Sequence, residues 1–308
     1  MGTSGTVSIA YYISAHGYGH GVRSCDIIRA VRRLYPQIDV HVVTDLPEMF
    51  LSSRLGPARV ARRPGSFDVG MVQLDSIRID IDATLERVER LHARREELTA
   101  AECECLREQG IRAVVADIPA LPLEAASRAG IPSLAVGNFS WDWVYSAYVE
   151  RDERWRRMAE FFREGYSRAG LLLRLPFCGP MPAFQHVEDI PLTASPGRNR
   201  RDEIASLSGC DPDGKWALLS FTTLDLDAEA QQNIGRIQWR ARNVRPLDGA
   251  RIPFSDIVAS MDVVVSKPGF GILSDCVVNR KPLVYAERRD FLEYPVLEEA
   301  VRRYLRHV

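Results

Sequence analysis

The sequence predicts an α/β protein built from two domains, each with a parallel sheet. Short apolar runs typical of buried strands alternate with helical patterns, and this alternation occurs twice along the 308 residues. A stretch with five prolines, residues 176–196, separates the two series. We therefore expect an N-terminal domain over residues 1–175, a proline-rich crossing over 176–212 and a C-terminal domain over 213–308.

The individual elements follow from the period of the apolar residues. In the first series, strands are predicted over Val7–Ser14, Val40–Thr44, Ala113–Ala116 and Ile131–Val136, with Ile77–Ile81 as a further candidate. Helices are predicted over Val22–Leu34, Thr84–Gln109 and Pro122–Ala129, and Trp141–Tyr166 also has a helical pattern. The second series has predicted strands over Trp216–Phe221, Val263–Val265 and Pro282–Tyr285, and a helix that begins at about Gly271.

The composition excludes several classes of protein. Hydrophobic residues make up 46% and charged residues 26%, and a net charge of −1 carries no signature of nucleic-acid binding. No apolar run reaches the roughly 18 residues of a membrane span, and residues 1–6 lack the features of a signal peptide. Cys103 and Cys105 do not have the spacing of a zinc site. We expect a cytoplasmic protein with reduced thiols and with no metal or cofactor.

The run Asp262–Asp275, DVVVSKPGFGILSD, has the pattern of an anion-binding turn. A buried strand passes through a Pro-Gly turn into a helix, whose N-terminal N–H groups point at the turn, and Lys267 adds a positive charge. Asp275 lies one turn into the helix, where its carboxylate could accept hydrogen bonds from the two hydroxyls of a ribose. The turn is neither a Walker loop nor a GxGxxG loop, and an ordinary strand–helix turn is the alternative. The candidate diphosphate and ribose residues are Ser266, Lys267, Gly269, Phe270, Gly271 and Asp275.

Two further segments at strand ends extend this candidate site. Thr222 and Thr223 follow one predicted strand and could donate hydroxyls to a phosphate. Asp290 and Glu293 follow the last predicted strand and could bind sugar hydroxyls, because loops at the carboxyl ends of parallel strands line the ligand crevice. Turn residues without a ligand and surface charges at the start of a helix are the alternatives.

The loop His16-Gly-Tyr-Gly-His20 occupies the corresponding turn of the first series. Gly17 and Gly19 allow the backbone to approach a ligand closely, and a histidine titrates near neutral pH, as a general base requires. Asp117 ends another strand of the same predicted sheet and could orient His20. Histidines that cap a helix, and an aspartate that caps a turn, are the alternatives.

Aromatic and acidic pairs elsewhere have weaker implications. Trp141 could provide an aromatic platform for a sugar or a lipid-like acceptor, although aromatic residues at this spacing are more often part of a core. The pairs Asp80/Asp82 and Asp225/Asp227 have the DxD form of a metal site. A match of three residues is expected by chance, and no metal is assigned to either pair.

These motifs resemble those of a known superfamily. The run DVVVSKPGFGILSDC with NRKPLVYAERRDFLEYPVL is similar to the donor-binding half of the GT-B glycosyltransferases. Within them it is nearest the group of the cell-wall lipid-linked N-acetylglucosaminyltransferase and the monogalactosyldiacylglycerol synthases. The runs ISAHGYGHGVRS and VVADIPALPLEAASRAGIPSLAVGNFSWDWVY resemble the glycosyltransferase-like N-terminal region of L-arabinokinase-type proteins. Together these runs cover about half of the chain.

The resemblance implies two Rossmann-like domains that face each other across a cleft. It places the nucleotide-sugar on the C-terminal domain, with its diphosphate at Ser266–Gly271, its ribose at Asp275 and its sugar near Asp290 and Glu293. It places the acceptor on the N-terminal domain and implies that His20 takes part in catalysis. Relative to the group, the stretch between Thr223 and Phe254 is short and the chain ends without a long closing helix, so a shortened second domain with reduced base recognition is expected.

The expected function is a metal-independent, inverting transfer of a sugar from a nucleotide diphosphate donor to an acceptor hydroxyl. His20 and Asp117 are the expected catalytic residues, and His16, Gly17, Gly19 and Trp141 lie on the acceptor side. The expected partners are the donor and an unidentified acceptor. Two alternatives remain, namely a nucleotide-sugar epimerase or hydrolase of the same fold, and a non-catalytic nucleotide-sugar-binding protein.

Overall fold

The computed structural model of the chain describes residues 6–56, 60–75, 77–220, 252–288 and 290–306. The chain forms two compact units. Unit 1 comprises Met1–Val72 and Asp80–Thr193, and unit 2 comprises Gln73–Ile79 and Ala194–Val308. These bounds differ from the predicted ranges, because the sequence did not indicate that residues 73–79 would pack with the C-terminal half.

Unit 1 contains a seven-stranded sheet in the order β3-β2-β1-β6-β7-β8-β9, in which every neighbouring pair is parallel. The predicted parallel α/β architecture is therefore confirmed. Three strands of this sheet, β3, β8 and β9, have no predicted counterpart, and β9 lies within the proline-rich stretch. The strands are β1 (Val7–Ile13), β2 (Ile38–Val43), β3 (Ala61–Arg63), β6 (Ile111–Asp117), β7 (Ser133–Gly137), β8 (Leu171–Arg174) and β9 (Val187–Asp189).

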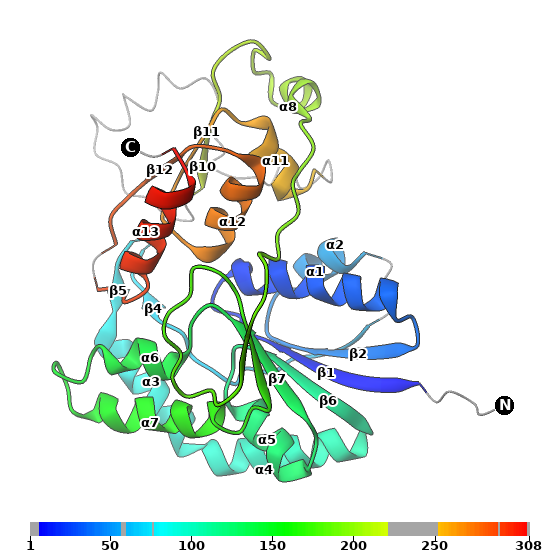
Figure 1. Ribbon diagram of the computed structural model, residues 1–308, viewed down its shortest axis with the longest axis vertical. Coiled ribbons are helices and arrows are strands. Elements are labelled where there is room, and N and C mark those ends of the chain that lie inside the picture. Colours follow the sequence, from blue (N-terminus) through cyan, green and yellow to red (C-terminus); the bar gives the residue numbers. More distant parts are fainter. Residues whose placement is uncertain (1–5, 57–59, 76, 221–251, 289, 307–308) are drawn as a thin grey trace. The chain divides into compact units, whose positions relative to one another are not determined.

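Helices cover both faces of this sheet, as Figure 1 shows. One face carries α1 and α2, and the other carries α4, α5 and α7. The predicted helix over Thr84–Gln109 is two helices that break at Arg94. The helices of unit 1 are α1 (Tyr18–Leu34), α2 (Glu48–Leu55), α3 (Ile81–Ala93), α4 (Arg95–Glu108), α5 (Leu121–Ala129), α6 (Trp141–Ser146) and α7 (Arg154–Tyr166).

The core on one face explains why α1 lies where it does. Cys25 and Ile28 of α1 and Leu51 of α2 pack onto Tyr11 and Val42 of the sheet, and all five side chains are at most 3% exposed. This apolar contact removes one side of α1 from water, which supplies most of a helix's stability in a protein. The first turn of α1 is thereby fixed above the carboxyl end of β1.

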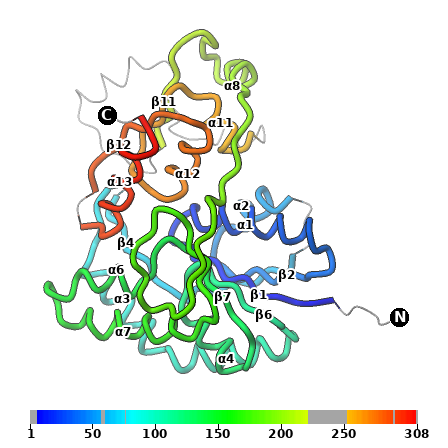
Figure 2. Tube along the Cα trace, in the orientation of Figure 1, coloured from blue at the N-terminus to red at the C-terminus, as the bar shows by residue number. Residues whose placement is uncertain are grey.

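The order of the strands creates a switch point at this same edge. After β1 the chain continues to β2 on one side, whereas β6 pairs with β1 on the other side. Figure 2 shows the trace of β1 between β2 and β6. In an open α/β sheet, ligands bind beyond the carboxyl ends of the strands at such a point. His16, His20 and Asp117 all follow or end these two central strands.

Unit 2 has a three-stranded parallel sheet in the order β10-β11-β12. A separate two-stranded sheet is made by β4 (Val72–Gln73) and β5 (Ile79–Asp80), so the strand predicted over Ile77–Ile81 exists only as this short hairpin and not in the main sheet. The elements of unit 2 are α8 (Arg201–Ser208), β10 (Ala217–Ser220), α11 (Phe254–Ser260), β11 (Val263–Ser266), α12 (Phe270–Asn279), β12 (Leu283–Tyr285) and α13 (Tyr294–Tyr304). Within the described ranges, no helix has both the length and the apolar character needed to cross a membrane.

Candidate active site

The turn after β1 presents two histidines at the sheet's carboxyl edge. The helix α1 begins at Tyr18, four residues before the predicted start at Val22, with Gly17 as its extended N-cap. His20 therefore lies in the first helical turn and not in a loop, and His16 lies in the preceding turn. Among the residues that the structure describes, no non-neighbouring atom lies within 4 Å of the position that a Cβ would occupy at Gly17 or Gly19.

His20 forms a dyad with Asp117 at the end of β6. The Nδ1 atom of His20 lies 2.8 Å from Asp117 Oδ1. Arg23 Nη2 lies 3.2 Å from the same ring nitrogen. The shorter contact with an ionised acceptor decides the tautomer, because an acceptor-only carboxylate requires a proton on Nδ1. Neutral His20 therefore carries its lone pair on Nε2.

The Nε2 atom of His20 is open to solvent. Nε2 has no hydrogen-bond partner in the part of the chain that the structure describes. The buried polar atoms without a partner do not include Nε2, so water can reach it. The His20 side chain is 12% exposed, whereas Asp117 is fully buried. The dyad thus has one buried end, which orients the ring, and one open end, which could accept a proton.

Asp117 is held as an anion by an array of donors. Arg23 Nε donates to Oδ2 at 2.7 Å and Arg23 Nη2 donates to Oδ1 at 2.5 Å, while Ser24 Oγ donates to Oδ2 at 2.7 Å. Burial alone would raise the pKa of Asp117, but the charge and hydrogen bonds of Arg23, together with His20, hold this pKa well below its usual range. Arg23 also donates to Asn138 at the end of β7.

A second histidine–aspartate pair lies beside the first. His16 Nε2 lies 2.7 Å from Asp68 Oδ1, and Trp141 Nε1 donates to Asp68 Oδ2 at 2.9 Å. Ser14 Oγ donates to the same oxygen. Burial alone would raise the pKa of Asp68, but His16 in particular, with Ser14 and Trp141, lowers it below its usual value. The sequence analysis identified His16 and missed Asp68.

An aromatic cluster supports both histidine rings. His20 contacts Phe139 edge-on at a centroid distance of 5.7 Å, and His16 contacts Trp141 edge-on at 5.5 Å. Phe139 and Trp141 contact each other at 4.9 Å, and Trp141 stacks on Tyr145. Trp141 is only 4% exposed, so the expected open platform is wrong for this side chain. Trp141 acts instead through its hydrogen bond to Asp68.

Gly70 provides a direct test of how tightly His16 is held. Its φ is +70°, and a Cβ at this position would lie 2.3 Å from His16 Cγ. Gly130 has a φ of +71° with no atom within 4 Å of its Cβ position, so it is a matched control. The left-handed backbone should cost about 1–2 kcal/mol of stability in Gly130→Ala, and Gly70→Ala should lose more because the His16 ring must move. Urea unfolding of both variants measures this, and equal losses would contradict a clamped ring.

In unit 2, the strand–turn–helix predicted from DVVVSKPGFGILSD is present. β11 ends at Ser266 and α12 begins at Phe270 after Gly269, its extended N-cap. The N-cap residue Gly269 has no side chain with which to cap the helix, and among the described residues no atom lies within 4 Å of its Cβ position. Ser266 is 3% exposed, and its Oγ donates to Ser220 O of the neighbouring strand β10. The N–H groups around Gly269 and Gly271 remain suited to an anion.

Lys267 lies in the turn before α12. Its Nζ donates to Gln73 Oε1 at 3.4 Å. Burial, reinforced by repulsion from Arg288, lowers the pKa of Lys267 to about 8. An anion placed beside this buried ammonium would stabilise its charged form.

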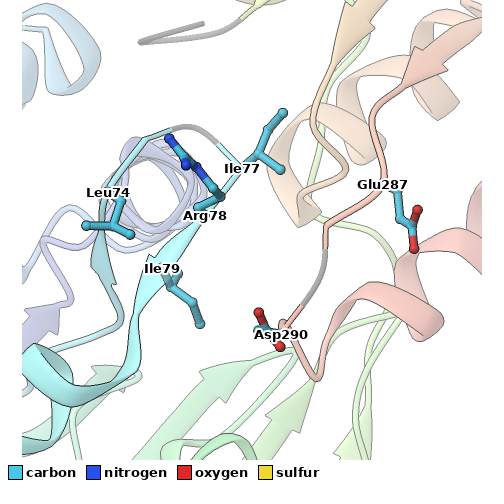
Figure 3. Close-up of a pocket in the computed structure, with 6 residues that line it drawn as sticks. All are labelled: Leu74, Ile77, Arg78, Ile79, Glu287 and Asp290. Carbon is cyan, nitrogen blue, oxygen red and sulfur yellow. The ribbon is translucent and has the colours of Figure 1, made fainter. Parts of the chain in front are cut away.

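The acidic residues after β12 line a cavity of about 250 Å³ in unit 2 (Figure 3). Glu287 and Asp290 come from the segment before α13, and Arg78 is one of the hairpin residues on the other side. Asp290 has a φ of +64°, which is uncommon for a residue other than glycine. Glu293 is the N-cap residue of α13 and does not line this cavity. The remaining lining residues are Leu74, Ile77 and Ile79.

Other predicted site residues have separate environments. Asp275 lies on α12, where its backbone carbonyl accepts a hydrogen bond from Asn279. Thr222, Thr223 and the pair at 225 and 227 lie outside the described residues. Asp80 caps α3 and Asp82 pairs with Arg151, and no cluster of three or more metal-binding side chains is found within the described ranges.

Comparison with solved structures decides the fold. The glycotransferase of kitacinnamycin superimposes with a TM-score of 0.62 at 15% identity, over 98% of this chain and 86% of that chain. Arabidopsis thaliana UGT89C1, solved with UDP-L-rhamnose, gives a TM-score of 0.60 at 12% identity, over 98% and 85%. The chain has the GT-B fold. The calicheamicin glycosyltransferase CalG4, another GT-B structure, gives 0.59 at 14% identity, over 98% and 85%.

A curated relative adds a similarity in sequence to this GT-B fold. The chain is 30% identical to L-arabinokinase from Arabidopsis thaliana in an alignment that covers 96% of this chain. It spans only 30% of the length of that protein. No protein-family model matches the chain. The expected resemblance to GT-B glycosyltransferases and to L-arabinokinase-type proteins is confirmed.

Two residues of the candidate site that were not predicted from the sequence had usable signals. Arg23 lies three residues after His20, a spacing that brings side chains together on a helix, and this could have indicated its contact with the same carboxylate. Asn138 directly follows the strand predicted over Ile131–Val136 and could have been placed at the carboxyl edge. Asp68 lies in an irregular stretch between β3 and β4, where no periodic pattern indicates its position.

Proposed function

We propose that this chain is a glycosyltransferase of hexosyltransferase type, which transfers a sugar from a nucleotide diphosphate-sugar to an acceptor hydroxyl. The observation that carries the proposal is the His20–Asp117 dyad at the switch point of a GT-B sheet, with Nε2 of His20 open to solvent. A base for an acceptor hydroxyl needs an oriented ring, an accessible lone pair and a buried counter-charge, and this dyad has all three.

The proposed reaction is a single inverting displacement. The acceptor oxygen forms a bond to the anomeric carbon of the sugar while the bond from that carbon to the diphosphate oxygen breaks. The acceptor proton moves to His20 Nε2, and Asp117 stabilises the imidazolium that results. The electron pair of the broken bond remains on the diphosphate. The reaction requires no cofactor.

The leaving diphosphate is assigned to the turn before α12. The N-terminus of α12 and the ammonium of Lys267 supply positive potential there without a metal ion. Asp275, Asp290 and Glu293 are proposed to bind the ribose and the sugar, and Thr222 and Thr223 the phosphates. Similar solved structures support a uridine diphosphate donor, because UGT89C1 was solved with UDP and with UDP-L-rhamnose, and Phytolacca americana UGT2 with UDP-2-fluoro-glucose.

Calorimetry with a panel of nucleotide-sugars tests this function. At least one UDP-sugar should bind, and UDP alone should compete with it. Consumption of the bound donor only when an acceptor is added would support transfer, whereas consumption without an acceptor would indicate an epimerase or a hydrolase. If no nucleotide-sugar binds, the glycosyltransferase, the epimerase or hydrolase and the non-catalytic nucleotide-sugar-binding protein are all wrong as hypotheses.

The affinity for UDP-glucose should depend on pH through Lys267. Because the pKa of this lysine is about 8 in the free chain and only its charged form attracts a diphosphate, affinity should be retained below pH 8 and fall as pH rises above it. Calorimetry on both sides of this pH measures the effect. Lys267→Arg, which stays charged, should remove the fall, and Lys267→Met should bind weakly at every pH. A wild-type affinity that does not change across this range would contradict the assignment.

A further inference from the structure

We propose that His16 and Asp68 form a second dyad, which binds another hydroxyl of the acceptor and so selects polyols over alcohols with a single hydroxyl. This inference rests on the proposed transfer reaction and specifies the class of its acceptor. His16 is here a binding residue, and Asp68 is a positioning residue that acts through it.

The carboxylate of Asp68 determines which nitrogen of His16 is available. Asp68 is buried, and its two oxygens accept hydrogen bonds from His16 Nε2, Ser14 Oγ and Trp141 Nε1. Three donors around one buried carboxylate keep it ionised, so that it acts only as an acceptor. The proton of neutral His16 is therefore on Nε2, and the lone pair is on Nδ1.

The two dyads use opposite nitrogens of their rings. His20 binds its carboxylate through Nδ1 and leaves Nε2, whereas His16 binds its carboxylate through Nε2 and leaves Nδ1. Nδ1 of His16 has no hydrogen-bond partner among the described residues. The buried polar atoms without a partner do not include Nδ1, so water can reach it. Each ring therefore offers solvent one nitrogen that accepts a hydrogen bond.

The His16 ring is held in place on two sides. Gly70 approaches so closely that a Cβ would lie 2.6 Å from Nδ1, and the edge of Trp141 contacts the ring at 5.5 Å. Tyr145 fixes Gly70 in turn, because its hydroxyl donates to Gly70 O at 3.1 Å. A ring that is fixed before the ligand arrives loses little entropy on binding, which favours a specificity-determining contact.

One aromatic pair joins the two rings. His20 contacts Phe139, Phe139 contacts Trp141 and Trp141 contacts His16, at centroid distances of 5.7, 4.9 and 5.5 Å. Two hydrogen-bond acceptors placed along this short series of rings match a molecule with several hydroxyls, of which one reacts at His20. A simple alcohol would use His20 alone and leave His16 without a contact.

The experiment compares two variants of His16 with matched acceptors. Gln can donate to Asp68 and present an oxygen acceptor, whereas Phe keeps the contact with Trp141 and loses both hydrogen bonds. Myo-inositol and methyl glycopyranosides serve as polyols, and cyclohexanol and phenol as acceptors with one hydroxyl. His92→Phe is the control, because His92 contacts Phe161 edge-on in another part of unit 1.

For the polyols, His16→Phe should lower kcat/KM by about 3–10-fold, through KM and with kcat unchanged, as expected for one lost hydrogen bond. Its kcat/KM for cyclohexanol and phenol should fall by a clearly smaller factor, and His16→Gln should recover most of the loss seen with the polyols. Equal losses for both classes of acceptor, or no recovery by Gln, would overturn the proposal and assign the pair to structure alone.

A measurement without turnover separates this proposal from the transferase itself. In imidazole ¹⁵N spectra of the whole chain, His16 should have its proton on Nε2, and myo-inositol should shift the Nδ1 resonance. A proton on Nδ1, or no shift with any polyol, would contradict the second dyad even if transfer is observed. If the protein consumed no donor, the proposed transferase activity would be wrong. The ¹⁵N spectra would then still test whether His16 and Asp68 form the second dyad.

Discussion

Replacement of His20 by alanine is expected to lower kcat by about 10²–10⁴-fold, the usual contribution of a general base. The affinity for a UDP-sugar should stay within about twofold of the wild type, because His20 belongs to unit 1 and the proposed diphosphate contacts belong to unit 2. Steady-state turnover and calorimetry on the same preparation measure the two quantities.

The control for this variant is His92→Ala, which removes a histidine that contacts Phe161 and lies outside the dyads. It should keep the wild-type kcat. If His20→Ala also turned over at the wild-type rate, His20 would not be the base, and a different residue at the carboxyl edge of the sheet would have to accept the proton.

Replacement of Asp117 by alanine should lower the free energy of unfolding by about 3–5 kcal/mol, as is typical when one partner of a buried ion pair is removed. The carboxylate is fully buried, and it accepts two hydrogen bonds from Arg23 besides those of Ser24 and His20. Urea unfolding at neutral pH measures the loss. Asp189→Ala is a suitable control, because Asp189 pairs with Arg174 at the exposed edge strand.

The same carboxylate should make stability depend on pH in the acid range. Because folding lowers the pKa of Asp117, its contribution is complete above the unfolded pKa of about 3.9 and is lost as pH falls from there towards the lower folded pKa. Asp117→Asn should lack this part of the acid dependence. An Asp117→Asn variant as stable as the wild type at pH 7, with the same loss in acid, would contradict the buried ion pair.

The strands and the central dyad could be predicted from the sequence because their signals are local. Apolar runs indicate β1 and β6, and the rule that ligands bind at the carboxyl ends of parallel strands predicts His20 and Asp117 at one edge of the sheet. The structure gives 2.8 Å between their side chains. The turn before α12 was likewise readable from its glycines and apolar strand.

The remaining features depend on contacts between distant parts of the chain. Asp68 contacts His16 although the two residues are 52 positions apart in the sequence. The segment around Asp68 has no periodic apolar pattern that would indicate its position. The residues of the hairpin Gln73–Ile79 belong to unit 2 although they are in the N-terminal half. Trp141 was predicted to lie on the acceptor side as an aromatic platform, but sequence spacing does not distinguish an exposed ring from one that packs on Tyr145.

The central claim is tested most directly by following a ¹³C-labelled UDP-sugar, chosen as the tightest binder, by NMR in the presence of pooled polyol acceptors. The proposal predicts that the donor signal disappears only when an acceptor is present. It also predicts a new glycoside with the opposite anomeric configuration, and no product with His20→Ala. A donor that stays intact with every acceptor, or that yields only free sugar and UDP, would contradict the assignment of this chain as a glycosyltransferase.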